Sequence, residues 1–257
     1  MLRLLIGNYL FIGLVASGCV MDLSQPVDEQ ASIESAVTLP HNQIQPITGI
    51  AEDRHETWGP EFSYKQGCKP YTAVDQHGNT NAGLKASGSE GGKCRDSDMG
   101  QLYARTREYP DGLVAHMYSL YFPKDNGFPF PSLGHRHDWE CVVIWVKDDS
   151  EVLKVAFSQH GDFKTYDPGD VHWSGNRVRV QYARSQFTHA FMPGHKGGST
   201  PVIASWDMLP EPAKRALNDT SFGRAITPMR ENRFQSQIDK SWPDRPAVAR
   251  FGGSERR

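Results

Sequence analysis

The chain carries little excess charge of either sign. Its 28 lysines and arginines against 30 aspartates and glutamates give a formal net charge of -2 over 257 residues. A nucleic-acid-binding protein needs a basic face that releases counterions from phosphate, so this balance argues against a nucleic-acid partner. It also argues against a polybasic patch that holds the protein on an anionic membrane. Any target must therefore be recognised through specific contacts.

The sequence also lacks internal repeats and low-complexity linkers in its middle. Residues 41–241 alternate short apolar stretches with turn clusters and are predicted to form one domain, since all-β folds often extend to roughly 200–250 residues. Residues 20–40 are polar and unpatterned and are predicted to form a flexible arm. Residues 242–257 are rich in proline, arginine and glycine and are predicted to form a mobile tail.

One extended apolar run lies at the N-terminus, where Arg3 precedes "LLIGNYLFIGLVA" and the small residues "SG". This arrangement is typical of a secretion signal, and the run is too short for a membrane span of about 20 apolar residues. We therefore predict export, with residues 1–19 as the leader. Two processing routes stay open: an ordinary cleaved signal, or lipidation of Cys19, because "VASGC" resembles a bacterial lipobox and would anchor the protein to the bacterial outer membrane.

Cysteine is scarce, with four residues in the chain. Cys19 belongs to the leader, which leaves an odd number in the domain. Cys68 and Cys94 lie in turn-rich sequence, "QGCKPY" and "GGKCRD", and are predicted to form a disulfide that stabilises the fold by roughly 3.5 kcal/mol in the chain-entropy model. Cys141 lies within an apolar run and is predicted to be a free, buried side chain.

Short apolar and aromatic stretches separated by glycine, proline and aspartate predict a mainly β protein. The segment "CVVIWV" (141–146) is apolar on both alternating faces, as expected of a strand covered on both sides. A helix is predicted over residues 209–219, where prolines and Glu211 precede lysine and arginine. The predicted fold is a central β-sandwich with a few flanking α-helices. Further strands are predicted at 101–109, 112–122, 151–163, 178–192 and 200–206.

The stretch "GHRHDWE", residues 134–140, places ionisable groups directly before the apolar segment. On a regular strand His135 would point away from Asp138 and Glu140, because successive side chains alternate between the two faces. We therefore predict an irregular bend that lets these three side chains converge, with the strand beginning near Trp139. Asp125 lies on the other limb of the same loop and can add an oxygen.

One imidazole with several carboxylates is an oxygen-rich environment that suits Mg²⁺, Ca²⁺ or Mn²⁺ better than a metal that prefers thiolate. The helical H-E-x-x-H pattern of zinc proteases is missing. Two other interpretations stay open at this point: an exposed polar loop with local salt bridges, and a hydrolase in which Asp138 pairs with His135 or His137. No nucleophile motif such as G-x-S-x-G accompanies the cluster, which argues against the hydrolase.

These residues carry a family resemblance. The stretch "GHRHDWE", preceded by "MYSLYFPKD" and followed by "CVVIWV", is similar to the hallmark of the necrosis- and ethylene-inducing peptide 1-like proteins, the NPP1 family of secreted cytolysins. The similarity covers roughly residues 41–241 and includes "GQLYAR", "SQHGDF" and "WDMLPEPAKRALND". It implies a β-sandwich like that of actinoporins and fungal fruit-body lectins, and a toxin that is not an enzyme.

The resemblance also implies partners and a cofactor. Members bind the sugar headgroup of glycosyl inositol phosphoryl ceramides in plant plasma membranes, permeabilise those membranes and elicit plant immunity, which makes plant immune receptors further partners. A divalent cation, Mg²⁺ or Ca²⁺, lies at the bottom of the headgroup pocket. The protein is expected to be an extracellular monomer and a virulence factor of a plant pathogen. Asn218 begins a glycosylation sequon, which matters only in a eukaryotic source.

Matching the family motif residue by residue assigns the site. The implied metal shell is Asp125, His135, Asp138 and Glu140, and the implied headgroup pocket adds Gly134, Arg136, His137, Trp139, His160, Thr188 and His189. The cysteines fit the single-disulfide class of the family.

Thr188 departs from the family pattern. Many members carry an acid at this position, so one negative charge is lost here. That loss, together with the lipid anchor that Cys19 could carry, favours a non-cytolytic, surface-tethered lectin or elicitor of the same fold as the main alternative. A secreted metallohydrolase is the less favoured one.

Overall fold

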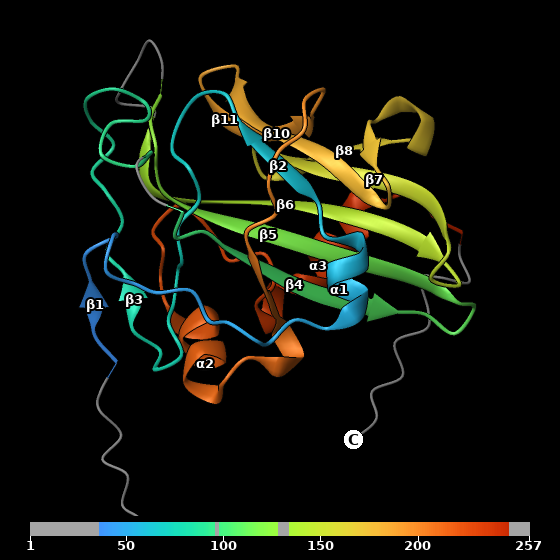
Figure 1. Ribbon diagram of the computed structural model, residues 1–257, viewed down its shortest axis with the longest axis horizontal. Coiled ribbons are helices and arrows are strands. Elements are labelled where there is room, and N and C mark those ends of the chain that lie inside the picture. Colours follow the sequence, from blue (N-terminus) through green and yellow to red (C-terminus); the bar gives the residue numbers. More distant parts are fainter. Residues whose placement is uncertain (1–35, 96–97, 128–133, 247–257) are drawn as a thin grey trace, which may run out of the picture. The chain divides into compact units, whose positions relative to one another are not determined.

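The computed structural model describes residues 36–95, 98–127 and 134–246. Its largest sheet within these ranges has the strand order β12-β4-β5-β6-β7-β8, with antiparallel pairing from β4 to β8 and a parallel pair between β12 and β4 (Figure 1). The strands are β4 (Gln101–Glu108), β5 (Leu113–Asp125), β6 (His135–Lys147), β7 (Glu151–Gln159), β8 (Asp162–Tyr166) and β12 (Val202–Ser205).

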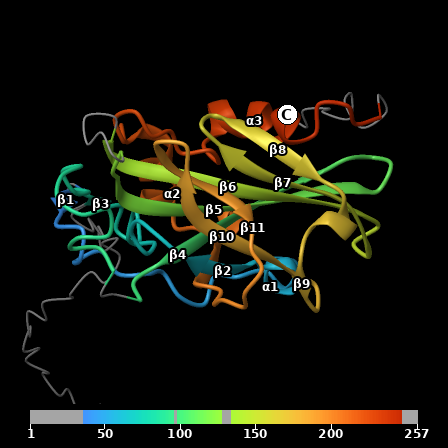
Figure 2. The same cartoon turned by 90° about the horizontal axis from the view of Figure 1, so that it is seen from above.

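A smaller sheet covers one face of the large one. It has the order β11-β10-β2, with β9 pairing at the edge of β10, and Figure 2 shows it on the opposite side of the large sheet from α3. The predicted mainly β sandwich with flanking helices is therefore confirmed. The elements are β2 (Glu61–Tyr64), β9 (Trp173–Ser174), β10 (Arg177–Ser185), β11 (Thr188–Pro193), α1 (Asp53–Trp58), α2 (Glu211–Asp219) and α3 (Glu231–Ser241).

Aromatic side chains fill the space between the two sheets. Phe122 of β5 stacks on Tyr182 of β10, with ring centroids 3.8 Å apart and an interplanar angle of 7°. Phe191 of β11 packs against both of these rings and against Phe62 of β2. All four side chains are fully buried. Because burying large aromatic side chains contributes much of a domain's stability, this layer fixes how β10 and β11 lie over β5.

The helix predicted at 209–219 is confirmed as α2, which begins at Glu211. Two further helices, α1 and α3, were not predicted. In α3 the apolar side chains Phe234 and Ile238 are spaced four residues apart and face the core. The end of α3 is held by Ser241, whose hydroxyl oxygen accepts a hydrogen bond from Trp145 Nε1 at 2.9 Å. The surrounding polar residues mask this short apolar stripe in the sequence.

Three strand predictions need correction. Residues 151–163 form not one strand but the hairpin β7–β8, because His160 and Gly161 both have positive φ and reverse the chain. Residues 178–192 likewise form the hairpin β10–β11, with Gln186 at positive φ in the turn. The strand predicted at 112–122 continues through Pro123 to Asp125.

The bend predicted in the heptapeptide is present, although β6 begins at His135 rather than near Trp139. The ladder between β5 and β6 pairs Phe122 with Asp138 and Lys124 with Arg136, and it is interrupted between them at Pro123 and His137. Proline has no N–H to donate, and His137 has a φ of 60°. The local twist at this position lets residues on either side of His137 depart from strict alternation.

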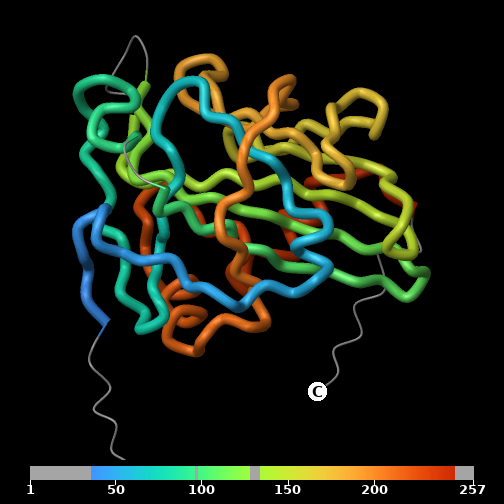
Figure 3. The backbone as a smooth tube through the Cα atoms, in the orientation of Figure 1, coloured from blue at the N-terminus to red at the C-terminus, as the bar shows by residue number. Residues whose placement is uncertain are grey.

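The disulfide prediction is confirmed, since Cys68 and Cys94 are bonded and Cys141 is free and buried. Both bonded cysteines lie in the long connection from β2 to β4, which runs along the end of the large sheet where β5 ends and β6 begins (Figure 3). This connection includes β3 (Thr80–Asn81), which pairs with β1 (Thr38–Leu39).

The ends of the described chain are more ordered than the sequence indicated. The segment assigned to a flexible arm contains β1, and the first residues assigned to a mobile tail pack on the core. Trp242 contacts Trp145, and the Arg245 guanidinium lies 5.4 Å from the centroid of the same ring. The predicted leader with Cys19, most of the arm and residues 247–257 lie outside the described residues.

A buried chain of hydrogen bonds joins α1 to the large sheet. His55 Nδ1 lies 2.7 Å from Ser205 Oγ and His55 Nε2 lies 2.8 Å from Thr106 Oγ1, which is 2.9 Å from His116 Nδ1. The far nitrogen of His116 lies 3.5 Å from the Asp149 carboxylate and forms no hydrogen bond. Both imidazoles are neutral in the folded protein, because burial lowers the pKa of each.

We expect these two histidines to make the fold acid-sensitive. Burial lowers the pKa of His55 to about 3 and that of His116 to about 4. Below the ordinary histidine pKa of about 6.5 the unfolded chain binds protons that the folded chain does not, so stability is lost as the pH falls from 6.5 toward the folded values. At pH 5 the expected loss is about 2 kcal/mol per histidine.

The measurement is the difference in free energy of unfolding between wild type and His116→Gln, by denaturant titration at pH 7 and pH 5. The stability gap between them should shrink by about 2 kcal/mol at pH 5, because only the wild type still carries the His116 penalty. Taking the difference cancels the opposite contribution of the buried carboxyl groups. His77→Gln, at an exposed position, should leave the gap to wild type independent of pH. A pH-independent gap for His116→Gln as well would contradict the expectation.

Candidate metal centre and pocket

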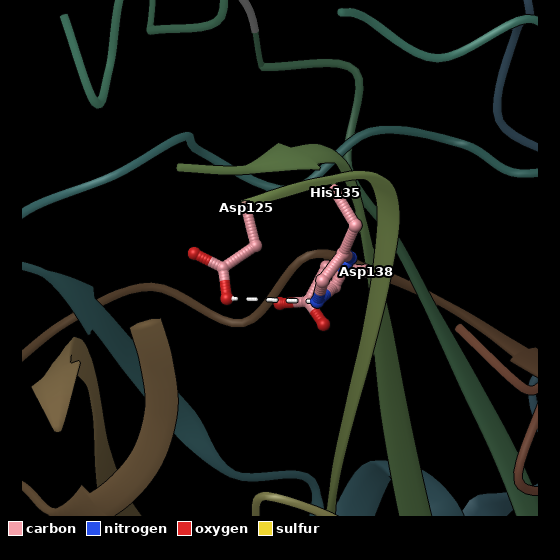
Figure 4. Close-up of side chains that lie close together, drawn as sticks. All are labelled: Asp125, His135 and Asp138. Carbon is pink, nitrogen blue, oxygen red and sulfur yellow. Dashed lines mark ion pairs between the residues drawn. The ribbon is translucent and has the colours of Figure 1, made fainter. Parts of the chain in front are cut away.

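Three of the four predicted metal-shell residues meet where β5 ends and β6 begins. One ligand atom from each of Asp125, His135 and Asp138 lies within 4.8 Å of the other two. Figure 4 shows the three side chains directed toward a common point, with His135 Nε2 4.0 Å from Asp125 Oδ2. Asp125 and Asp138 are buried and His135 is half-buried. Of the three side chains predicted to converge, His135 and Asp138 therefore do so, joined by Asp125 from the other limb of the loop, and Glu140 does not join this group.

The backbone holds His135 in the tautomer that a metal ligand needs. Its Nδ1 lies 2.6 Å from the carbonyl oxygen of His137, so Nδ1 carries the proton and donates it. The Nε2 lone pair is then free to face Asp125. A hydrogen bond from the second ring nitrogen to a carbonyl is a common support for metal-ligating histidines. The positive φ of His137 belongs to the same short turn that makes this contact.

Asp125 is positioned by His189. The imidazole Nδ1 of His189 lies 2.6 Å from Asp125 Oδ1, and its backbone N–H donates to Oδ2 at 3.0 Å. The His189 ring is itself buried and stacks on Tyr182, with centroids 5.1 Å apart. His189, predicted only as a pocket histidine, therefore fixes the orientation of a carboxylate in the cluster.

The carboxyl group of Asp138 has a raised pKa in this cluster. Burial, together with the neighbouring Asp125 carboxylate, raises the pKa of Asp138 to about 7, and His135 works against this rise. The Tyr182 hydroxyl donates to Asp138 Oδ2 at 3.0 Å. Two buried carboxylates that repel each other this strongly are an arrangement that a bound cation would relieve.

Glu140 lies beside the cluster and not within the group of close ligand atoms. It lines the same pocket, and the Ser158 hydroxyl donates to Glu140 Oε2. Burial and the Asp138 charge raise the pKa of Glu140 well above its ordinary value.

The remaining heptapeptide residues build the turn. Arg136 Nη1 donates to the carbonyl oxygens of Ala82 and Gly83, at 2.8 and 3.3 Å, which ties β6 to the neighbouring connection. His137 turns away from the cluster, and its Nδ1 lies 2.7 Å from the Tyr121 hydroxyl. Trp139 is buried, with its ring 5.5 Å from that of Tyr121. The side chain of His137 is thus not paired with Asp138, which removes one of the two acid–base pairs considered for a hydrolase.

Gly134 is required by a close backbone approach. A Cβ at this position would lie 2.6 Å from the Asp125 carbonyl oxygen and 2.8 Å from the Gly127 nitrogen. Any side chain would push the two limbs of the loop apart. The glycine at the start of the heptapeptide therefore allows Asp125 to reach the cluster. Of this loop, residues 128–133 lie outside the described part of the chain.

His160 and Thr188 come from the two hairpins that the sequence did not resolve. His160 begins the β7–β8 turn and Thr188 begins β11, and the Thr188 hydroxyl lies 3.2 Å from His160 Nδ1. Both residues line the pocket above the cluster. Thr188 lines the same pocket but is not one of the three residues whose ligand atoms converge. The arrangement of Asp125, His135 and Asp138 therefore does not depend on an acid at position 188.

The cluster forms one side of a pocket of about 370 Å³. The rest of the lining includes α3 and the segment between α2 and α3, which the sequence did not indicate as part of the site. Since these elements follow the heptapeptide by some ninety residues, only the fold brings them there. The pocket residues missed by the sequence are Cys141, Ser158, Gly161, Asp162, Arg224, Ala225, Ile226, Pro228, Arg233, Gln237 and Lys240.

The disulfide-closed connection braces Asp125 from both sides. The buried Lys124 ammonium donates to the Ser87 and Ser89 carbonyl oxygens at 3.0 and 2.9 Å. The Asn126 amide donates to the Gly88 carbonyl oxygen at 3.0 Å. The residues flanking Asp125 are therefore bound to the same three-residue segment.

Glu90 extends this brace to the other sheet. Its Oε1 accepts hydrogen bonds from Arg184 Nε and Nη2 at 2.9 and 2.6 Å and lies 3.9 Å from His189 Nε2. Glu90 lies between the bonded cysteines in sequence. The disulfide thus closes the loop that supports both Asp125 and its partner His189.

The donor set fits a hard divalent cation. Two carboxylates and one imidazole with a free lone pair converge, and a third carboxyl group lies next to them. Among the described residues that line the pocket, sulfur comes from the buried Cys141 alone. Oxygen-rich sets of this kind suit Mg²⁺, Ca²⁺ and Mn²⁺. The raised pKa values of Asp138 and Glu140 reflect the cost of burying like charges, and a cation bound by this donor set would offset that cost.

Comparison with known proteins gives a consistent picture. The family model described as necrosis inducing protein (NPP1) matches residues 52–241. NLP effector protein 1 of Phytophthora capsici is 34% identical over 219 residues, which cover 81% of this chain and 92% of the relative. The necrosis-inducing protein NPP1 of Phytophthora nicotianae is 39% identical over 191 residues, covering 71% and 79%.

Solved structures also resemble the chain. The crystal structure of the non-toxic HaNLP3 protein aligns with a TM-score of 0.74 and 35% identity, covering 80% of this chain and 100% of that one. A relative named NLPPya, solved with mannosamine and with glucosamine, aligns with a TM-score of 0.71 and 30% identity, covering 79% and 98%.

Proposed function

The chain belongs to the necrosis inducing protein (NPP1) family, and from this membership we propose that it is an exported cytolysin that binds plant glycolipid headgroups through a divalent cation. The observation that carries the proposal is the convergence of Asp125, His135 and Asp138 at the base of a pocket. The family includes effectors and necrosis-inducing proteins, and relatives have been solved with amino sugars.

Asp125, His135 and Asp138 would hold the cation directly, and Glu140 would hold it through water. When bound, the ion would offer coordination positions to sugar hydroxyls. His189 and the His137 carbonyl keep the ligands oriented, and the Tyr182 hydroxyl steadies Asp138. Recognition needs no chemical step in this scheme, so we propose a binding protein and not an enzyme.

Membrane contact would be made by the rim of the pocket. Ile226 lines the pocket and is 45% exposed, and Phe187, which adjoins the pocket residue Thr188, is 49% exposed. Apolar side chains at the rim of a polar pocket suit a site that binds a headgroup at a bilayer surface. Among the described residues no helix is long and apolar enough to cross a membrane.

A non-cytolytic lectin or elicitor is the second candidate function. Its support is the similarity to a relative described as non-toxic, together with the neutral Thr188 where the family resemblance leads one to expect an acid. Cys19 lies outside the described residues, so its lipidation stays a prediction, as do contact with plant immune receptors and a monomeric state. A metallohydrolase remains the least supported alternative.

Dye release from lipid vesicles separates these functions. We expect purified protein with Mg²⁺ or Ca²⁺ to release dye from vesicles that contain plant glycosyl inositol phosphoryl ceramide, and not from vesicles of phosphatidylcholine alone. A chelator should stop the release. Cation-dependent binding to the sphingolipid vesicles without release would favour the lectin, and cleavage of the headgroup would favour the hydrolase.

Removing the disulfide should weaken cation binding. We expect Cys68→Ser/Cys94→Ser to lower the free energy of unfolding by roughly 3.5 kcal/mol in the chain-entropy model. Because the closed loop supports Asp125 and His189, we also expect cation affinity to fall about tenfold, in the range seen when residues that support metal ligands are changed. Calorimetric titration with Ca²⁺ at a temperature where the variant is folded checks this. Cys141→Ser, which leaves the loop closed, is the control and should bind as wild type does. Unchanged affinity in the double variant would contradict the coupling.

A further inference from the structure

We propose that the pocket selects a sugar unit that bears a negatively charged group, and that Arg224 and Arg233 bind this group opposite the metal cluster. The inference rests on the proposed function, because it assigns the chemistry of the ligand that the cation helps to hold. The candidate ligand class is an acidic sugar, for which a uronate is the simplest probe.

One face of α3 points into the pocket. Arg233, Gln237 and Lys240 follow one another at spacings of four and three residues, which places them on the same side of a helix. All three line the pocket, while Phe234 and Ile238 on the adjacent face are buried in the core. Packing of the apolar face therefore fixes the direction of the polar one.

Arg224 joins this face from the segment that precedes α3. It follows Gly223, whose φ of 67° turns the chain, and it lines the same pocket. Phe222, two residues before Arg224, is buried against Tyr121 and against His137 and Trp139 of the heptapeptide. This packing anchors the turn at Gly223 on the heptapeptide. The backbone at Arg224 is thus held near the site by the residues that build the site.

The two arginines have cationic groups to offer. Within the described ranges neither the Arg224 nor the Arg233 guanidinium forms an ion pair or a side-chain hydrogen bond, and both residues are exposed. Lys240 differs, because its ammonium donates to the Gly161 carbonyl oxygen at 2.9 Å. The acid on this side of the pocket, Asp162, is exposed, and its Oδ1 accepts a hydrogen bond from the Phe163 N–H at 2.9 Å.

The pocket therefore has two chemically different sides. The cluster side, with its cation, suits vicinal hydroxyls, and the arginine side suits carboxylate or phosphate oxygens, which guanidinium groups bind in a bidentate manner. A neutral hexose would use only the first side. A volume of about 370 Å³ lies in the ordinary range of small-molecule pockets, which is roughly 300–1,000 Å³. An acidic sugar can therefore use both sides at once.

The same charges disfavour a cationic sugar. The relative NLPPya was solved with mannosamine and glucosamine, which carry an ammonium group at neutral pH. In this chain such a group would approach Arg224 and Arg233, and like charges at close range weaken binding. The expected order of affinity is glucuronide, then glucoside, then glucosamine.

The test is a titration of the full chain, with saturating Ca²⁺, by methyl β-glucuronide and by methyl β-glucoside, followed by NMR or calorimetry. These two probes differ only in the carboxylate at C6. We expect wild type to bind the glucuronide about tenfold more tightly, which corresponds to one net charge-assisted contact. In Arg224→Gln/Arg233→Gln the two probes should bind within about twofold of each other.

The control is Lys196→Gln/Arg215→Gln, which removes the same charge from exposed positions outside the pocket and should keep the preference. Equal binding of the two glycosides by wild type overturns this inference and leaves the cation-dependent function standing. If Arg224→Gln/Arg233→Gln, the pocket variant, still prefers the glucuronide, the inference is also overturned, because the cation and not the two arginines would then bind the carboxylate. Failure of both glycosides to bind in the presence of Ca²⁺ overturns the proposed function and the inference together.

A vesicle arm separates a sugar-borne charge from a charged bilayer. Phosphatidylglycerol vesicles without sugar headgroups present anionic phosphate alone. We expect wild type and the pocket variant to bind them equally weakly. If the pocket variant loses vesicle binding while its glucuronide preference is unchanged, the two arginines serve the bilayer surface and the inference is overturned.

Discussion

Asp138→Asn is expected to abolish cation binding and, at the same time, to stabilise the cation-free protein. Asp125 and Asp138 are both buried, with ligand atoms within 4.8 Å of each other. Removing one of two buried like charges relieves repulsion, and the amide oxygen introduced by the substitution can still accept the hydrogen bond from the Tyr182 hydroxyl. We expect a gain of roughly 1–3 kcal/mol in the free energy of unfolding without cation at pH 8.

The measurement is thermal or denaturant unfolding with and without Ca²⁺. Wild type should gain about 2.7 kcal/mol at a cation concentration about one hundred times the dissociation constant, and Asp138→Asn should gain nothing. Asp162→Asn is the matched control, because it makes the same change at an exposed position of the same pocket, and it should respond to Ca²⁺ as wild type does. A cation-free Asp138→Asn protein less stable than wild type would mean that the cluster is structural.

His135→Ala should eliminate dye release from vesicles that contain plant sphingolipid. The side chain supplies the one imidazole of the cluster, and its loss removes a direct ligand while leaving the fold intact, since the ring is half-buried and makes one hydrogen bond to the nearby His137 carbonyl. Loss of a direct ligand should lower the affinity for the cation by more than about 100-fold, which exceeds the effect of changing a residue that only supports a ligand. At fixed Ca²⁺ the rate of release should then fall at least about tenfold, because little of the protein holds its ion.

The readout needs two controls. His77→Ala removes an exposed histidine outside the pocket and should release dye as wild type does. Circular dichroism should confirm that His135→Ala is folded, and excess Ca²⁺ should restore part of its activity if affinity is the cause. Release at the wild-type rate by folded His135→Ala in limiting Ca²⁺ would rule out a role for this ligand.

The cluster of Asp125, His135 and Asp138 is the part of the site that the sequence predicts best. On a regular strand His135 and Asp138 would face opposite ways, so their proposed convergence required a bend, and the positive φ of His137 opposite Pro123 provides it. The prediction worked because proline and glycine on the two limbs limit the local backbone to a few conformations. Placing the start of the strand near Trp139 was wrong because the ladder continues on both sides of the bend.

The hairpins at the pocket illustrate where sequence patterns fail. The β7–β8 turn is His160-Gly161 and the β10–β11 turn contains Gln186 and Phe187, and neither interrupts an alternating apolar stretch strongly. Apart from glycine, a two-residue turn contains few residue types that identify it in a sequence. The stretches were therefore predicted as single strands.

The arginine side of the pocket could not be predicted from the sequence at all. Arg224 and Arg233 lie in a polar segment whose apolar stripe, Phe234 and Ile238, is two residues wide. Their position depends on the packing of α3 against the large sheet, which is a tertiary property. The support of Asp125 by His189 was missed for a similar reason, since the two residues are 64 positions apart and meet only when β11 lies over β5.

The role of the cation in sugar recognition is tested most directly by a single titration of wild-type protein with methyl β-glucoside, with added Mg²⁺ or Ca²⁺ and then with excess chelator. We expect saturable binding in the presence of the cation, loss of that binding on chelation, and recovery when the cation is restored. Sugar binding of the same affinity in chelator would contradict this expectation, because the acidic cluster would then have no part in recognition.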